Sequence, residues 1–214
     1  MRDEQSATAE VLAIFDAIYG DGDKAFATRA VARFSSVDNP SSRVRCAVAL
    51  WHASNGAFAR AREQVGGLTT DFRVDAVPVT GCRALVEAWI AVGERRPEAQ
   101  RLLNALDSVT VVGLPLGDAR PYGGIALARL YLELGAPDLA LAAVRRRPYY
   151  RAWPAYLASY LRMEATLAEQ LGDRAAAARA WRHYLTLREH PEPVLAADAA
   201  RASATLARLS QSGP

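Results

Sequence analysis

The chain has 214 residues, of which 51% are hydrophobic, so it can bury a sizeable core. We expect one elongated domain rather than two compact ones. Its 26 basic and 23 acidic side chains leave a formal charge of only +3, which argues against the strongly positive field of a nucleic-acid-binding protein.

The N-terminus carries no apolar run, so neither a signal peptide nor a membrane span is expected. These features predict a soluble cytoplasmic chain. A first helix so close to Met1 also leaves room for an upstream domain, including one that is anchored in a membrane.

The N-terminal hairpin, predicted over 5–36, introduces the pattern of the whole chain. Its apolar residues recur at three- and four-residue intervals, which predicts two amphipathic helices. The turn at 20–23 reads Gly-Asp-Gly-Asp. We expect a glycine there to end the first helix with a positive backbone dihedral, and an aspartate to cap the second.

The same pattern predicts four further hairpins in chain order. They lie at about 41–66, 80–108, 121–147 and 152–190. Two connections, 66–79 and 109–121, are longer than helix packing usually requires. We interpret them as loops folded back over the hairpin edges, with contact to a partner as the alternative. A last helix over 193–210 lacks a partner of its own and is predicted to cap the array with its polar face.

Five glycines mark these units, each closing one apolar helical stretch and preceding another. They are Gly20, Gly56, Gly93, Gly135 and Gly172, at steps of 36, 37, 42 and 37 residues. Such a period with two helices per unit is typical of a helical repeat array, in which each hairpin stacks on its neighbours to bury its apolar face. An alanine follows each of these glycines by five residues, or by six in the third unit, and its small side chain is expected to let two helices approach closely. These alanines are Ala25, Ala61, Ala99, Ala140 and Ala177.

The chain has two cysteines, Cys46 and Cys82, which are too few for a disulfide-stapled scaffold and wrongly spaced for a zinc or redox motif. We interpret both as small buried apolar residues. They stand ten residues before Gly56 and eleven before Gly93, so stacked helices could bring them close. The sequence leaves open whether they form a disulfide.

The fourth unit resembles the tetratricopeptide repeat consensus, in which a Leu and a small residue precede an aromatic residue, a Gly and an Ala. The matching residues are Leu127-Ala128, Tyr131, Gly135 and Ala140. The fifth unit is similar through Leu171-Gly172-Asp173, Ala177 and Tyr184-Leu185. With three weaker matches, the resemblance covers residues 5 to 190. It implies an all-α fold, a right-handed α-solenoid of about five hairpins plus a C-terminal capping helix, as a single domain over 1–214.

The C-terminal third also resembles the repeat regions of bacterial signalling proteins, which follow serine/threonine kinase or transcription-regulator domains. This resemblance implies a sensor or scaffold. No motif in the chain supports an enzyme: it has no kinase signature and no phosphate-binding loop. Its three histidines have no second ligand at metal spacing, and its serines have no neighbouring base. We therefore expect no catalytic residues, no cofactor and no metal.

In tetratricopeptide superhelices the first helix of each pair lines the concave face. Counting back ten and six residues from each glycine places Ile14 and Leu50 in an apolar N-terminal part and arginines in the C-terminal part. The expected partner-binding groove consists of Arg83, Glu87, Trp89, Tyr122, Arg129, Arg162 and Thr166. An arginine row suits bidentate capture of carboxylates on a peptide, and a solvated helix face is the alternative.

A second candidate is a basic and aromatic patch at the end of the fourth hairpin. It consists of Arg145, Arg146, Arg147, Tyr149, Tyr150, Arg151 and Trp153. Such a mixture can stack bases and neutralise phosphates. We favour a structural interpretation, because arginine stabilises a helix C-terminus and aromatic side chains fill seams between hairpins.

The expected function is a protein-interaction scaffold or sensor module that binds a peptide or protein segment in its groove. One alternative is a regulatory module that binds nucleic acid or a small ligand. Another is a self-assembly element in which the region of Ile14 and Leu50 meets a second copy. We expect a protein partner rather than nucleic acid or a membrane, and the sequence leaves homo-oligomerisation open.

Overall fold

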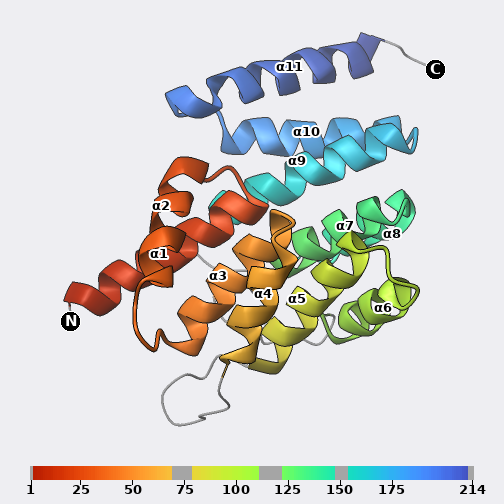
Figure 1. Cartoon of the computed structure of the whole chain (residues 1–214). Helices are drawn as coiled ribbons and strands as arrows, with labels where there is room; N and C mark the ends of the chain where they lie inside the picture. Colours follow the sequence, from red (N-terminus) through yellow and green to blue (C-terminus); the bar gives the residue numbers. More distant parts are fainter. Residues whose placement is uncertain (1, 69–78, 111–121, 148–153, 212–214) are drawn as a thin grey trace.

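The structure is a computed structural model, and it describes residues 2–68, 79–110, 122–147 and 154–211 (Figure 1). Regular structure in these ranges is entirely helical, and none of the described residues forms a strand. The all-α fold predicted from the glycine period is therefore confirmed. The two long connections lie mostly in 69–78 and 111–121, outside the described residues.

Ten α-helices of the described chain pair into five antiparallel hairpins. The pairs are α1 (Arg2–Tyr19) with α2 (Lys24–Ser35), α3 (Ser42–Ser54) with α4 (Phe58–Gly66), α5 (Val79–Gly93) with α6 (Ala99–Thr110), α7 (Gly123–Glu133) with α8 (Pro137–Arg145), and α9 (Pro154–Gln170) with α10 (Arg174–Leu187). Neighbouring first helices pack side by side along the row. These bounds lie close to the predicted hairpins.

One further helix ends the array. A short 3₁₀ turn, Pro193–Leu195, leads into α11 (Ala196–Gln211), which packs on α10 at the outer end of the row (Figure 1). Its Arg201, Ser203 and Arg208 are exposed, as expected of a capping helix. No helix in the described ranges combines the length and the apolar character needed to cross a bilayer.

The glycines at the hairpin turns serve two different purposes. Gly56, Gly135 and Gly172 have φ angles of 74°, 72° and 78°, the left-handed conformation that glycine adopts without steric cost. Gly93 is instead the last residue of α5, and a Cβ there would lie 2.2 Å from the ring of Phe58 on α4. The period therefore marks three chain reversals and one close helix approach.

The first turn is tight without any positive φ, so that part of the prediction is wrong. The amides of Gly20 and Gly22 both donate to the carbonyl oxygen of Asp16, at 2.7 and 3.2 Å. A Cβ on Gly22 would lie 2.6 Å from the backbone nitrogen of Ala17, so the chain folds directly over the end of α1. The predicted cap is confirmed, because the Asp23 carboxylate accepts hydrogen bonds from the first amides of α2.

Buried side chains from α1 to α9 form one continuous core, and a second cluster joins α9, α10 and α11. Four of the predicted small residues are buried in their hairpins: Ala61, Ala99, Ala140 and Ala177. Ala25 is exposed, and the buried alanines of α2 are Ala27 and Ala30. The spacing found in the other units therefore does not apply to the first hairpin.

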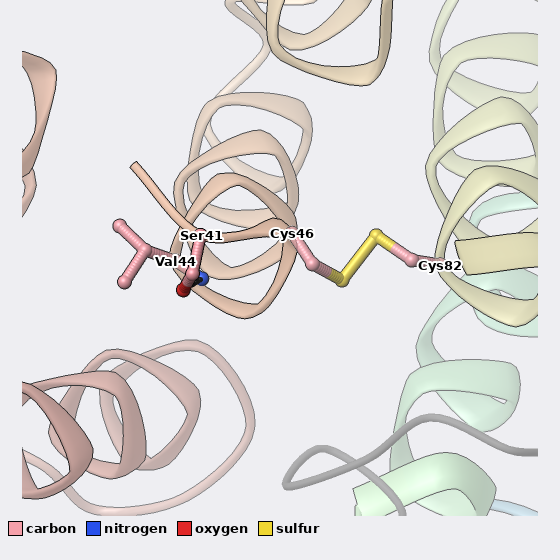
Figure 2. Close-up of a disulfide and its surroundings, with 4 residues drawn as sticks. All are labelled: Ser41, Val44, Cys46 and Cys82. Atoms are coloured by element: carbon pink, nitrogen blue, oxygen red, sulfur yellow. Dashed lines mark hydrogen bonds between the residues drawn. A yellow bond between two sulfur atoms is a disulfide. The ribbon is translucent and has the colours of Figure 1, made fainter. Parts of the chain in front are cut away.

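Cys46 on α3 and Cys82 on α5 form a disulfide with a Cα–Cα distance of 6.0 Å (Figure 2). Both residues are buried, as interpreted from the sequence, and they form the bond that the sequence left open. Their near-equivalent positions in adjacent hairpins explain why they meet. Figure 2 also shows Ser41, whose hydroxyl oxygen accepts a hydrogen bond from the amide of Val44 and so caps α3.

Candidate binding pocket between α1, α7 and α9

The first hairpin lies against helices that follow it by more than a hundred residues. The Tyr122 hydroxyl donates to Asp16 Oδ1 at 3.0 Å, and the Arg129 guanidinium donates to the carbonyl oxygen of Ile18. Arg162 on α9 forms an ion pair with Asp21 at 2.5 Å. The row of hairpins therefore curves until the end of α1 meets α7 and α9, and the first turn fills part of its inner side (Figure 1).

A pocket of about 210 Å³ remains between the end of α1, α7 and α9. Three of the residues predicted for the groove line it together: Arg129, Arg162 and Thr166. Thr166 is exposed at the opening, so the pocket can be reached from solvent. The faces of α7 and α9 that are found by counting back from the glycines therefore meet at one pocket.

The positive charge of Arg162 is balanced within the chain. Its guanidinium lies between the carboxylates of Asp21, at 2.5 Å, and Asp198, at 3.2 Å. Asp21 also pairs with Arg188 at 3.4 Å, and Asp198 pairs with Arg201. This network ties α9, α10 and α11 to the first turn.

Arg129 differs, because its guanidinium donates to the carbonyl oxygen of Ile18 and no carboxylate of the described residues lies within 4.0 Å of it. Burial lowers the pKa of this half-buried guanidinium, while the nearby Tyr19 acts to raise it. An arginine stays protonated under such shifts. The pocket therefore contains one positive charge that no carboxylate of the described residues contacts directly, although Asp21 is close enough to raise its pKa.

Tyr19 is 1% exposed and lines the same pocket. Its hydroxyl has no hydrogen-bond partner among the described residues. Burial raises the pKa of this hydroxyl, so it remains a donor at neutral pH. The indole N–H of Trp89 lies near enough to lower that pKa in part, but the two groups do not meet in hydrogen-bonding geometry. Sequence reasoning missed Tyr19 because it reads as an ordinary core aromatic of α1.

The remaining lining comes from α7 and α9. Leu132, Met163 and Leu167 supply apolar surface, and Ser159 and Gln170 supply polar groups. Ser159 is 4% exposed and Gln170 is exposed, so the pocket has a polar buried end and a polar rim.

The other predicted groove residues do not join this pocket. Arg83 donates to the carbonyl oxygen of Leu68 at 2.7 Å, and Glu87 pairs with Arg96 at 2.7 Å. Tyr122 is 1% exposed, which excludes it as a surface anchor. Trp89 packs partly buried against the core.

The apolar N-terminal part of the predicted groove is not a surface. Ile14 and Leu50 are both 0% exposed, since neighbouring helices cover them. The proposed contact with a second copy through these two side chains therefore has no exposed atoms to use.

The basic part of the second candidate patch is paired with carboxylates. Arg145 and Arg147 both contact Glu164, at 3.4 and 2.7 Å, and Arg146 pairs with Asp107. This pairing favours the structural interpretation of the three arginines. The other members of the patch lie outside the described residues: Tyr149, Tyr150, Arg151 and Trp153.

Comparisons with protein-family models, with curated proteins and with solved structures find no match to this chain. The tetratricopeptide resemblance therefore stays a prediction. Within the described ranges no group of three or more His, Cys, Asp or Glu side chains could hold a metal ion.

Proposed function

We propose that the chain is a binding module that holds a segment of a peptide or protein partner on the inner side of its hairpin row. The observation that carries this proposal is the pocket in which Arg129, Arg162 and Thr166 come together around an uncompensated positive charge. A half-buried charge without a contacting carboxylate is costly in the free chain, so an anionic group of a ligand would relieve that cost. The proposal involves no catalytic step, cofactor or metal.

The rim of the pocket suits contact with an extended segment. Leu132 and Thr166 are exposed beside its opening, on α7 and α9. A partner could therefore insert one side chain or one chain end into the pocket and lie across both helices. Such insertion of a small anchor with a surrounding rim is the usual organisation of a protein interface.

Binding of a small molecule is the second candidate function. At about 210 Å³ the pocket is smaller than the sites that enclose drug-sized ligands, so it suits a ligand smaller than those. The described part of the Arg145–Arg147 cluster gives no comparable support for nucleic acid, because each of its guanidiniums contacts a carboxylate.

A blocking substitution at the rim tests the proposal. Random dodecamer peptides displayed on phage are selected on the immobilised protein, and the selected sequences are then synthesised and titrated by fluorescence anisotropy. Thr166→Trp, at the pocket rim, should weaken their binding about tenfold or more, since a bulky side chain excludes the anchor.

Thr186→Trp is the matched control. Thr186 is an exposed threonine of α10 whose hydroxyl donates to the carbonyl four residues earlier, as that of Thr166 does. The control should bind the peptides like the wild-type chain. Failure to enrich any peptide, or equal affinity of both variants for the selected peptides, would count against a segment-binding site at this pocket.

The cytoplasmic location stays a prediction, and the disulfide weighs against it. Cys46 and Cys82 are bonded between two helices, whereas disulfides persist mainly in oxidising compartments and are rare in the cytosol.

A further inference from the structure

Two donor groups with unused hydrogen-bonding capacity lie together in the pocket between α1, α7 and α9. The Arg129 guanidinium has no carboxylate within 4.0 Å among the described residues, and the buried Tyr19 hydroxyl has no hydrogen-bond partner there. Both are donors, and both residues line the same pocket. Buried polar groups in native proteins are almost always hydrogen-bonded, so the Tyr19 hydroxyl indicates an acceptor that the described residues do not supply. Arg129 donates to the carbonyl oxygen of Ile18 and still lacks a carboxylate, so the acceptor it suits is an anion.

We propose that the pocket binds the carboxylate of a short aliphatic acid, with Arg129 and Tyr19 as donors. This inference rests on the proposed function, because it names the chemical group that the binding site accepts. The aliphatic body of the ligand lies against Leu132, Met163 and Leu167, which form the apolar surface of the pocket.

A single negative charge fits the electrostatics better than a dianion. Arg129 supplies one positive charge that no carboxylate of the described residues contacts, whereas the nearby Arg162 already contacts two carboxylates. The Asp21 carboxylate is close enough to raise the pKa of Arg129, so a doubly charged phosphate would meet repulsion from it. A carboxylate also matches the planar fork of a guanidinium, which can donate two parallel hydrogen bonds.

The size and polarity of the pocket limit the rest of the ligand. A volume of about 210 Å³ suits a body of a few carbon atoms. Two sources supply such a group: a free short-chain acid, or the C-terminal residue of a peptide with an aliphatic side chain. The chemistry at Arg129 and Tyr19 is the same for both.

Titration of the ¹⁵N-labelled chain by NMR separates these possibilities with four probes. The probes are 4-methylpentanoate, 4-methylpentanamide, acetyl-Ala-Ala-Leu with a free carboxylate, and the same peptide as its C-terminal amide. We expect at least one carboxylate probe to bind and its amide to bind about tenfold or more weakly, because the amide lacks the charge. Tighter binding of the free acid identifies a small-molecule ligand, and tighter binding of the peptide identifies a chain end.

Tyr19→Phe is the decisive variant, since it removes only the hydroxyl. Affinity for the carboxylate should fall about three- to tenfold, as expected for one lost hydrogen bond. The thermal unfolding midpoint should not fall, because that hydroxyl has no partner in the free chain. If Tyr19 were only structural, Tyr19→Phe would lower the unfolding midpoint and leave the affinity for the carboxylate unchanged.

Arg129→Gln should reduce carboxylate affinity about tenfold or more, while Arg146→Gln, at an arginine that already pairs with Asp107, should leave it unchanged. Amides that bind as well as the acids would overturn the carboxylate inference and leave the segment-binding proposal standing. The inference also fails if no carboxylate probe binds the folded chain, or if Tyr19→Phe and Arg129→Gln, both folded, bind it like the wild type. The phage-selected peptides would then still test the proposed function on their own.

Discussion

The two arginine clusters of this chain differ in how completely their charges are balanced. At the end of α8, Arg145 and Arg147 share Glu164, and Arg146 pairs with Asp107. In the pocket, Arg162 is equally well paired, but Arg129 is not. The comparison shows that a density of arginines in the sequence does not indicate a binding site. What matters is whether a guanidinium is left buried without a carboxylate.

The two clusters also differ in the origin of their partners. Glu164 lies within twenty residues of Arg145 and Arg147 and comes from the next hairpin, whereas Asp21 comes from the first turn of the chain, more than a hundred residues from Arg162. Pairing of the first kind accompanies the stacking of neighbouring hairpins. Pairing of the second kind requires the whole row to curve back on its beginning.

The largest change in stability should arise at the disulfide, which lies outside both clusters. Removing it tests whether the stability of the fold can change without a change in binding at the pocket. Replacing Cys46 and Cys82 together by alanine should lower the free energy of unfolding by about 3 to 4 kcal/mol, because the bond closes a loop across a sequence separation of 36 residues. Urea unfolding of the wild-type and double-variant chains measures the loss.

Reduction of the wild-type chain is the companion measurement. Dithiothreitol should lower the wild-type urea midpoint toward that of the double variant and leave the double variant unaffected. Identical wild-type midpoints with and without reductant would contradict a disulfide that stabilises the fold. Carboxylate binding at the pocket should survive in the folded double variant, since the pocket is lined from α1, α7 and α9.

The carboxylates that serve the two clusters provide the next comparison. Asp21 and Glu164 have side chains that are 12% and 13% exposed, and each contacts two arginines. Asp21→Asn should cost about 2 kcal/mol, because it removes a counter-charge from Arg188, whose side chain is only 16% exposed, and one of the two counter-charges of Arg162. Glu164→Gln should cost about 1 kcal/mol or less, since the arginines it serves are more exposed.

Urea unfolding at low and moderate salt measures both losses. The smaller Glu164→Gln effect should shrink further as salt is added, because exposed pairs are screened more than buried ones. Equal losses at the two positions would mean that closure of the row contributes no more than an ordinary contact between neighbours.

Much of the fold could be predicted, because the signals that define it are local. The apolar intervals and the recurrent glycines place all five hairpins, and Gly56, Gly135 and Gly172 are conformationally required at their turns. Gly93 shows the limit of that reasoning. Glycine is needed at this position because a Cβ would collide with the ring of Phe58 on the neighbouring hairpin, and no local sequence pattern reveals that contact.

The site could be predicted only in part. The helical register brings Arg129, Arg162 and Thr166 together, and all three line one pocket, because residues on one face of neighbouring helices remain neighbours. It could not show that Asp21 and Ile18 occupy the inner side, since the curvature of the row depends on the sum of many helix contacts. The helical register also could not decide whether Cys46 and Cys82, in near-equivalent positions, form a disulfide, because their distance depends on how the hairpins stack.

The smallest predicted effect concerns the pH dependence contributed by Asp16, which accepts a hydrogen bond from Tyr122 beside the pocket. Burial raises the pKa of Asp16, with Tyr122 opposing that shift and Asp21 adding to it. The folded chain therefore holds this proton more strongly than the unfolded chain does. Stability from this group is present below the ordinary pKa of 3.8 and is lost as the pH rises through the raised folded value.

Asp16→Asn keeps an oxygen acceptor for Tyr122 and removes the titration. Relative to the wild type, the variant should thus become more stable as the pH rises from 3 to 7, as measured by urea unfolding at each pH. Asp38→Asn, at an exposed position, provides the reference for removing one surface carboxylate. A difference that stays constant with pH, or that slopes the other way, would show that the Asp16 carboxylate is better solvated or better paired than its position beside Tyr122 and Asp21 indicates.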